Sequence, residues 1–256
     1  MKEQLHTIPV SEAFEQAGEC PFCYIERKTE DHVMDFVLGH GASYMEADIR
    51  EMTDQTGFCR AHFKKMFDYG NALGNAWILK THYRKTIDEM NQKFAKFRPG
   101  SGAKKSGFFR KADASTSSNS ICQWIQKKED SCFICDSVRR TFTDYMDTFF
   151  RMYKKEPSLR ETVENSKGFC LTHFGMLCEA ADSSLTGSDL TGFYDTVLPL
   201  MQHNMERLYE DVAWFVEKYD YRNKDADWKT SKDAIQRGMQ KLKGGDPSLP
   251  PHEYKK

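Results

Sequence analysis

Two versions of one seven-residue motif decide how this chain is read: GFCRAHF at residues 57–63 and GFCLTHF at residues 168–174. Each follows a Cys-x-x-Cys pair, CPFC at residues 20–23 in the first case and CFIC at residues 132–135 in the second. The chain covers 36 positions from Cys23 to Cys59 and 35 from Cys135 to Cys170. Because two motifs recur in the same order at nearly the same spacing, the sequence predicts an internal duplication.

Each repeat supplies three cysteines and one histidine, which together are a typical zinc ligand set. A Cys-x-x-Cys pair directs two sulfurs towards one point, and residues three apart at the start of a helix share a face. A helix N-terminus also favours thiolate over thiol. The sequence therefore predicts one metal site in each half and about two zinc ions per chain. The expected groups are Cys20, Cys23, Cys59 and His62 in the first half, and Cys132, Cys135, Cys170 and His173 in the second.

Other uses of these cysteines fit the sequence less well. A thioredoxin-like pair needs a βαβ setting, and an iron–sulfur cluster usually takes four cysteines, although iron remains an alternative to zinc. Buried thiols without a metal also remain open. Four protein ligands leave no position for water or substrate, which is typical of structural sites. Cys122 and Cys178 fall outside the repeat, and we expect Cys178 to lie in the core.

The fold class predicted is all-α, an internally duplicated helical bundle in which each half is closed by its own metal site. Apolar residues recur every three or four positions after the second CxxC, as on one face of a helix. We expect further helices at 24–38, 63–73, 76–97, 174–181 and 190–219, with Pro199 kinking the last or marking its start. The predicted division is 1–97, first half; 98–120, a flexible, basic linker; 121–222, second half; and 223–256, a C-terminal helix and tail.

The charge balance and the distribution of apolar residues argue against nucleic-acid-binding, secreted and membrane-spanning proteins. The 37 Lys and Arg residues are balanced by 38 Asp and Glu, a formal net charge of −1, which disfavours a nucleic-acid-binding protein. Residues 1–19 show no secretory signal, and no apolar run is long enough to span a membrane. Both observations favour the cytoplasm, where cysteines stay reduced and disulfides are rare.

The C-terminal segment invites two interpretations. Ser231 is a candidate N-cap for a helix whose apolar face contains Ile235, Met239 and Leu242, and Gly244-Gly245 should end that helix. Such a helix would pack back on the body of the protein. The alternative is a cationic docking patch formed by Arg222, Lys232 and Arg237.

The same segment carries a family resemblance. WFVEKYDYRN, starting at Trp214, and the pattern W-x2-SKDA-x2-R-x3-KL-x-G, ending at Gly244, resemble a bacterial family of unknown function found mostly in anaerobic Gram-positive bacteria. The two CxxC and GFCxxHF repeats resemble the same family. The resemblance implies an architecture and a bacterial cytoplasmic setting, and it implies no reaction.

We therefore expect a zinc-binding helical scaffold or adaptor with two structural Cys3His sites, acting on a protein partner rather than as an enzyme. No motif typical of nucleotide binding, hydrolysis or metalloprotease activity occurs in the sequence. Two alternatives stay open at this point. One is a thiol-based redox sensor or enzyme that uses the same cysteines, and the other is a nucleic-acid-binding protein that uses the basic linker.

Overall fold

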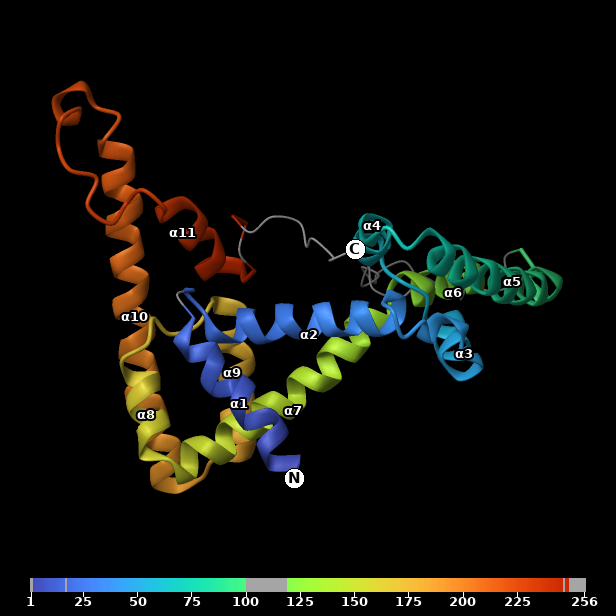
Figure 1. Ribbon diagram of the computed structural model, residues 1–256, viewed down its shortest axis with the longest axis horizontal. Coiled ribbons are helices and arrows are strands. Elements are labelled where there is room, and N and C mark those ends of the chain that lie inside the picture. Colours follow the sequence, from blue (N-terminus) through green and yellow to red (C-terminus); the bar gives the residue numbers. More distant parts are fainter. Residues whose placement is uncertain (1, 17, 100–118, 246, 249–256) are drawn as a thin grey trace, which may run out of the picture. The chain divides into compact units, whose positions relative to one another are not determined.

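The computed structural model describes residues 2–16, 18–99, 119–245 and 247–248. These residues form eleven α-helices and two 3-10 helices, and none of them lies in a β-strand, so the all-α prediction is confirmed (Figure 1). Most of the predicted linker, residues 100–118, lies outside the described residues. Within the described part of the chain, no helix combines the length and apolar character that crossing a membrane requires.

The chain divides into two compact units that are each built from both sequence halves. Among the described residues, unit 1 comprises those up to Thr29 and those from Arg139 onwards, and unit 2 comprises Glu30–Val138. Two helices contribute residues to both units, α2 (Pro21–Leu38) and α7 (Phe133–Lys155). The boundaries of the units therefore differ from those of the halves at 1–97 and 121–222.

Unit 1 contains the longest of the described helices, α10 (Gly187–Glu217), and a C-terminal helix, α11 (Ala234–Lys243), that folds back against it (Figure 1). Pro199 lies inside α10, so it does not mark the start of that helix as one prediction allowed. Besides parts of α2 and α7, the helices of unit 1 are α1 (Lys2–Glu15), α8 (Pro157–Glu164), α9 (Leu171–Ser184), α10 (Gly187–Glu217), η2 (Tyr221–Asn223) and α11 (Ala234–Lys243).

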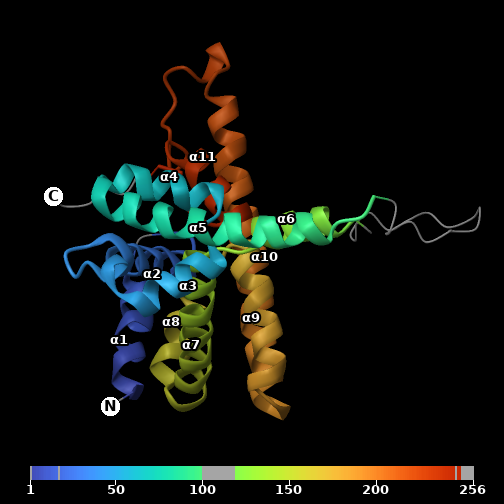
Figure 2. The same cartoon turned by 90° about the vertical axis from the view of Figure 1, so that its right-hand side faces the viewer.

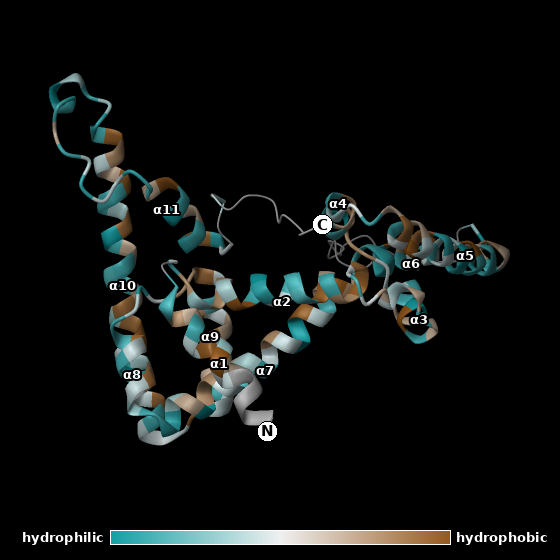
Figure 3. Cartoon of the chain, in the orientation of Figure 1, coloured by the Kyte–Doolittle hydropathy of each residue, from teal (hydrophilic) through white to brown (hydrophobic). Residues whose placement is uncertain are grey.

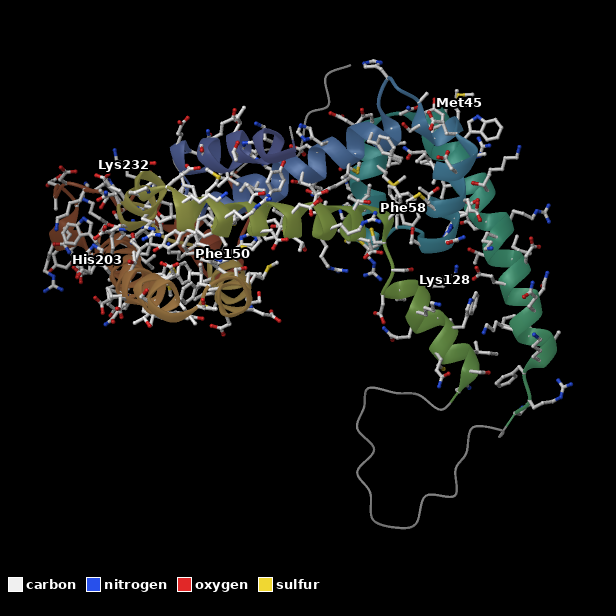
Figure 4. The ribbon with its side chains drawn as sticks, turned by 90° about the horizontal axis from the view of Figure 1, so that it is seen from below. Met45, Phe58, Lys128, Phe150, His203 and Lys232 are labelled. Atoms are coloured by element: carbon white, nitrogen blue, oxygen red, sulfur yellow. The ribbon has the colours of Figure 1, made fainter. Side chains whose placement is uncertain are left out.

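The core of unit 1 is rich in aromatic rings. Phe150, which Figure 4 labels, contacts Phe149 and Phe193 edge to face, with ring centroids 5.1 and 5.5 Å apart. Phe22 of α2 packs against Phe169, just before α9, with centroids 5.5 Å apart. Because such pairs add to the stability that burial alone gives, they fix the positions of the helix ends that carry cysteines.

Unit 2 is arranged around α5, which contacts α3, α4 and α6 (Figure 2). Its buried apolar residues include Met34, Phe58 and Ile78. Besides parts of α2 and α7, the helices of unit 2 are η1 (Ser43–Met45), α3 (Ala47–Thr56), α4 (Arg60–Tyr69), α5 (Ala72–Lys96) and α6 (Ser120–Glu129).

Helix α11 departs from its prediction in two respects. It begins at Ala234 with Asp233 as its N-cap, whereas the buried Ser231 donates its hydroxyl to the carbonyl of Trp228. The helix also reverses the usual amphipathic pattern, because it buries Gln240 and Lys241. Figure 3 shows hydrophobic and hydrophilic turns along it. The apolar side chains predicted to pack inwards are about half exposed: Ile235 43%, Met239 56% and Leu242 50%.

Of the three cations in the suggested docking patch, Arg237 is held in ion pairs inside unit 1, whereas Arg222 and Lys232 are exposed. Arg237 is 14% exposed and pairs with Asp211 at 2.9 Å and Asp233 at 2.8 Å. Arg222 pairs with Asp220 at 2.6 Å. Helix α11 itself packs against α9 and α10 of unit 1, as the first interpretation expects, although it does so through its polar side.

Candidate metal centres

The structure brings all eight predicted ligands into two groups of four, but each group takes one pair from each half. The first site consists of Cys20, Cys23, Cys170 and His173, and the second site of Cys59, His62, Cys132 and Cys135. Each CxxC pair therefore meets the CxxH pair of the other half. The predicted pairing, which closed each half with its own site, is wrong.

At the first site, one imidazole nitrogen faces three sulfurs at nearly equal distances. The Nδ1 atom of His173 lies 3.4 Å from the Sγ of Cys20, 3.5 Å from that of Cys23 and 3.3 Å from that of Cys170. The Sγ atoms of Cys23 and Cys170 are 3.8 Å apart.

The second site repeats this arrangement. The Nδ1 atom of His62 lies 3.2 Å from the Sγ of Cys59, 3.3 Å from that of Cys132 and 3.4 Å from that of Cys135. The Sγ atoms of Cys59 and Cys135 are 3.9 Å apart. In Figure 4 sulfur atoms, drawn in yellow, are visible near the labelled Phe58, which directly precedes Cys59.

These spacings fit a tetrahedral metal ion. Zinc–sulfur bonds of about 2.3 Å and zinc–nitrogen bonds of about 2.0 Å place neighbouring sulfurs about 3.8 Å apart, and sulfur and nitrogen about 3.5 Å apart. At each site the three nitrogen–sulfur separations and the one sulfur–sulfur separation given above match these values. A disulfide would instead bring two sulfurs to about 2.05 Å. The donor atoms of each group lie within 4.8 Å of one another, so each group could hold one ion.

Two helix N-termini meet at each site. Cys20 directly precedes α2 and Cys170 is the N-cap of α9 at the first site. At the second, Cys132 directly precedes α7 and Cys59 is the N-cap of α4. The partial positive charge of a helix N-terminus favours thiolates, which are the form of cysteine that binds metals.

A glycine in the left-handed region positions each CxxH pair. Gly57 has φ +66° and Gly168 has φ +73°, so the chain turns sharply just before the phenylalanine and cysteine that follow. A side chain would be strained at either position. Phe58 and Phe169 then enter the cores of their units, which leaves the next residue to begin a helix at the site.

Carboxylates approach the imidazole nitrogen that faces away from the sulfurs. The Nε2 atom of His62 lies 2.7 Å from Oε1 of Glu30, and Oε2 of the same carboxylate accepts a hydrogen bond from Lys65 at 2.5 Å. The Nε2 atom of His173 lies 3.6 Å from Oε2 of Glu26. Such partners fix the tautomer and ring orientation of a metal-binding histidine. Glu26 follows Cys23 by three positions on α2, a spacing that could have suggested it from the sequence.

The pKa values at the second site show how strongly its groups interact. Burial lowers the pKa of His62, but hydrogen bonds with Cys132 and Glu30 outweigh burial and raise it to about 10. Burial raises the pKa of Cys132, but His62 more than reverses this and the value falls to about 6. Burial and the charge of Cys132 raise the pKa of Cys135 to about 12. A divalent cation would offset this repulsion and allow all three thiols to ionise.

At the first site too, the pKa of one thiol is lowered and that of another is raised. Hydrogen bonds from Cys20 and Cys23 lower the pKa of Cys170, whereas hydrogen bonds with Cys170 and Cys20 raise that of Cys23. Burial lowers the pKa of His173, but hydrogen bonds with Cys170 and Cys20 raise it to about 10. Each cluster is therefore suited to a cation that replaces its protons.

The two sites differ in exposure. All four residues of the first site are buried, whereas Cys59 and Cys135 of the second are only half-buried. At the first site, the Sγ of Cys170 also accepts a hydrogen bond from the backbone N–H of His173 at 3.4 Å. At the second, the side chain of Cys59 makes no such capping bond. Outside both sites, Cys122 is exposed and Cys178 is half-buried rather than in the core.

Residues near the C-terminus complete the surroundings of the first site. Gln240, Lys241 and Gly244 contact the segments that carry its cysteines, and sequence reasoning assigned them no such role. The one signal that pointed to them was the KL-x-G part of the motif ending at Gly244. They are too far from either CxxC in sequence for spacing alone to connect them.

Comparison with known proteins places the chain in a family. A search of curated proteins and a search of solved structures gave no match. A family model, described as a family of unknown function (DUF6062), matches residues 1–248, which include both candidate metal centres and α11. The chain belongs to this family of unknown function.

Proposed function

We propose that the protein is a zinc-stabilised helical scaffold or adaptor with one structural zinc ion at each Cys3His site. The observation that carries this proposal is the geometry: in both groups an Nδ1 atom and three Sγ atoms stand at the separations of a zinc tetrahedron. The crossed ligand sets add a structural role, because each ion would join segments of the chain that lie far apart in the sequence.

The choice of zinc follows from the ligands. Three thiolates and one imidazole suit zinc, which has no preferred geometry of its own and accepts the tetrahedron that the protein provides. Magnesium and calcium prefer oxygen ligands. A [4Fe–4S] cluster would need four ligands spaced around a cube of several atoms, whereas these donors surround a space suited to one ion.

The structural role follows from the number of ligands. Four protein donors close the coordination sphere, so no position remains for a substrate or an activated water. Both histidines turn their second nitrogen towards glutamates, Glu26 and Glu30. Those carboxylates orient a ligand and do not face an open coordination position.

Metal content is the direct test. Elemental analysis of native, untagged protein should give about two zinc ions per chain, as the ligand sets require. Iodoacetamide should label the exposed Cys122 before the six ligand cysteines, since a metal-bound thiolate is a weaker nucleophile. Metal-free protein whose eight thiols all titrate freely would contradict the proposal. Rapid labelling of one ligand cysteine in the metal-bound protein would contradict the structural role.

A protein is the partner that this scaffold suits best. The half-exposed Ile235, Met239 and Leu242 of α11 provide apolar area of the kind found at protein interfaces. The double variant Ile235→Ser/Met239→Ser should keep its metal and lose binding to a protein partner that the wild-type chain retains. Salt-dependent binding to RNA or DNA, with no protein complex, would contradict this part of the proposal.

A further inference from the structure

We propose that α11 is a clamp that retains the metal ion of the first site, with Lys241 and Gly244 as its positioning residues. This inference rests on the proposed zinc sites and concerns how tightly one of them holds its ion. The second site has no counterpart to this clamp among the described residues, and we expect it to exchange its metal faster.

Helix α11 binds both segments of chain that carry the ligands of the first site. The ammonium group of the buried Lys241 donates to the backbone carbonyl of Glu19 at 3.2 Å and to that of Lys167. Glu19 precedes Cys20, and Lys167 lies three residues before Cys170. One side chain therefore ties the start of the CxxC segment to the start of the GFCxxH segment.

A second contact strengthens the hold on the CxxC segment. Oε1 of Gln240 accepts a hydrogen bond from the backbone N–H of Glu19 at 3.2 Å. The carboxylate of Glu19 is fully buried and pairs with Arg207 at 2.5 Å, with Arg237 of α11 at 3.6 Å and with Lys241 at 3.7 Å. Ligand exchange requires the cysteine segments to move, and these bonds oppose that movement.

The end of α11 covers the sulfur atoms themselves. Gly244 has φ +79°, and a Cβ at this position would lie 3.4 Å from the Sγ of Cys170 and 3.5 Å from that of Cys23. The backbone of Gly244 therefore packs directly over two of the four ligands. A Cβ here would touch both sulfurs, and any side chain would be strained at this positive φ. A chelator that attacks the metal from this direction must first displace the end of α11.

Charge favours the same arrangement. Three thiolates and one zinc ion carry a net charge of −1, which is costly to bury without compensation. The side chain of Lys241 is 1% exposed; burial lowers its pKa, and the charges of Glu19, Cys20 and Cys170 oppose that shift. A positive charge buried beside the site would offset part of that net negative charge.

The chain offers closely matched control positions. Lys243 lies on the same helix and is exposed, so Lys243→Met is the control for Lys241→Met. Gly245 also has a positive φ, +68°, but nothing lies within 4 Å of the position of its Cβ. Gly245→Leu therefore also places a side chain at a positive φ, but without touching the sulfurs.

The experiment follows zinc release from the full-length protein to the chromogenic chelator 4-(2-pyridylazo)resorcinol in excess. Wild type should release zinc in a fast and a slow phase, and Cys59→Ala should keep the slow phase alone, which assigns it to the first site. Lys241→Met and Gly244→Leu should accelerate the slow phase by at least ~10-fold, the lower range for changes around a metal site. Lys243→Met and Gly245→Leu should leave it unchanged. Urea unfolding of each variant shows whether faster release merely follows lost stability.

Each outcome bears on a different claim. A slow phase that keeps its wild-type rate in Lys241→Met would overturn the clamp, and so would equal acceleration by Lys241→Met and Lys243→Met. Acceleration that simply parallels a fall in unfolding free energy would overturn it too. Protein that contains no zinc before the chelator is added would instead overturn the proposed metal sites.

Discussion

The first and second sites share their ligands and local geometry but differ in what surrounds them. At the first, the ring of His173 stacks on Phe142 with centroids 5.0 Å apart, and all four ligands are buried. At the second, Cys59 and Cys135 reach solvent in part, and the closest support is Glu30, 2.7 Å from His62. The same motif can therefore produce a deeply enclosed centre and an accessible one, because the enclosing residues come from elsewhere in the chain.

The largest expected effect is the loss of a ligand. Cys170→Ser should lower the free energy of unfolding of unit 1 by several kcal/mol, part of the ~10–16 kcal/mol that structural zinc contributes in small peptides. Cys59→Ser should lower that of unit 2 by less, because fewer aromatic contacts depend on its site. Hydrogen exchange measured by mass spectrometry in urea reports on each unit. Equal losses, or a comparable loss for the exposed Cys122→Ser, would contradict the ranking.

A smaller effect should come from the buried carboxylate beside the first site. Glu19→Ala removes the buried carboxylate that pairs with Arg207 and Lys241 and should cost unit 1 about 3–5 kcal/mol, as when one member of a buried ion pair is removed. Glu12→Ala is the control, because Glu12 pairs with Lys28 near the surface, where such pairs contribute under about 1 kcal/mol. Urea unfolding should separate the two variants. Equal losses of unfolding free energy in Glu19→Ala and Glu12→Ala would show that the ion pairs of Glu19 do not support the first site.

The smallest effect should distinguish the two carboxylates that face the histidines. Glu30→Gln should weaken zinc binding at the second site by roughly 10-fold, the low end for losing such a partner. Glu26→Gln should change the first site less, because its carboxylate is 3.6 Å from His173 and half exposed. Chelator competition measures both affinities, each in a variant whose other site has been removed. A larger effect for Glu26→Gln would reverse this part of the comparison.

The sequence was informative wherever local spacing carries the information. The CxxC and CxxH pairs, the all-α class and helices such as α2 and α7 follow from periodicity and ligand chemistry. Helices α1, α3, α6 and α8 were not predicted, since α1 contains Pro9 and the other three have only 10, 10 and 8 residues. Short helices depend on tertiary packing more than on their own pattern.

The pairing of the motifs could not be predicted, because it depends on where long helices take the chain. An α-helix rises about 1.5 Å per residue, so α2 with 18 residues extends about 27 Å beyond Cys20, and α7 with 23 residues extends about 34 Å beyond Cys132. Each CxxC pair thus starts a helix that leads away from it before the CxxH pair of the same half is reached. The spacing between the CxxC and CxxH pairs is nearly equal in the two halves, at 36 and 35 positions, and it therefore suggested that each half forms its own site.

That the polar side of α11 faces inwards could not be predicted from the sequence either. The apolar Ile235, Met239 and Leu242 suggested the buried face by the usual rule. Lys241 is buried instead, because Glu19 and the backbone carbonyls beside the first site satisfy its charge and its donors. A pattern-based prediction assumes an apolar core, and it fails where a helix packs against charged groups.

The central claim is that each metal ion joins one pair from each half, and paired double variants test it most directly. Cys20→Ala/Cys170→Ala removes two ligands from the first site alone, so about one zinc ion per chain should remain after dialysis against a mild chelator. Cys20→Ala/Cys59→Ala removes one ligand from each site, so almost no zinc should remain. Native mass spectrometry counts the ions. The opposite result, with zinc retained only by Cys20→Ala/Cys59→Ala, would show that each half closes its own site and would contradict the crossed arrangement.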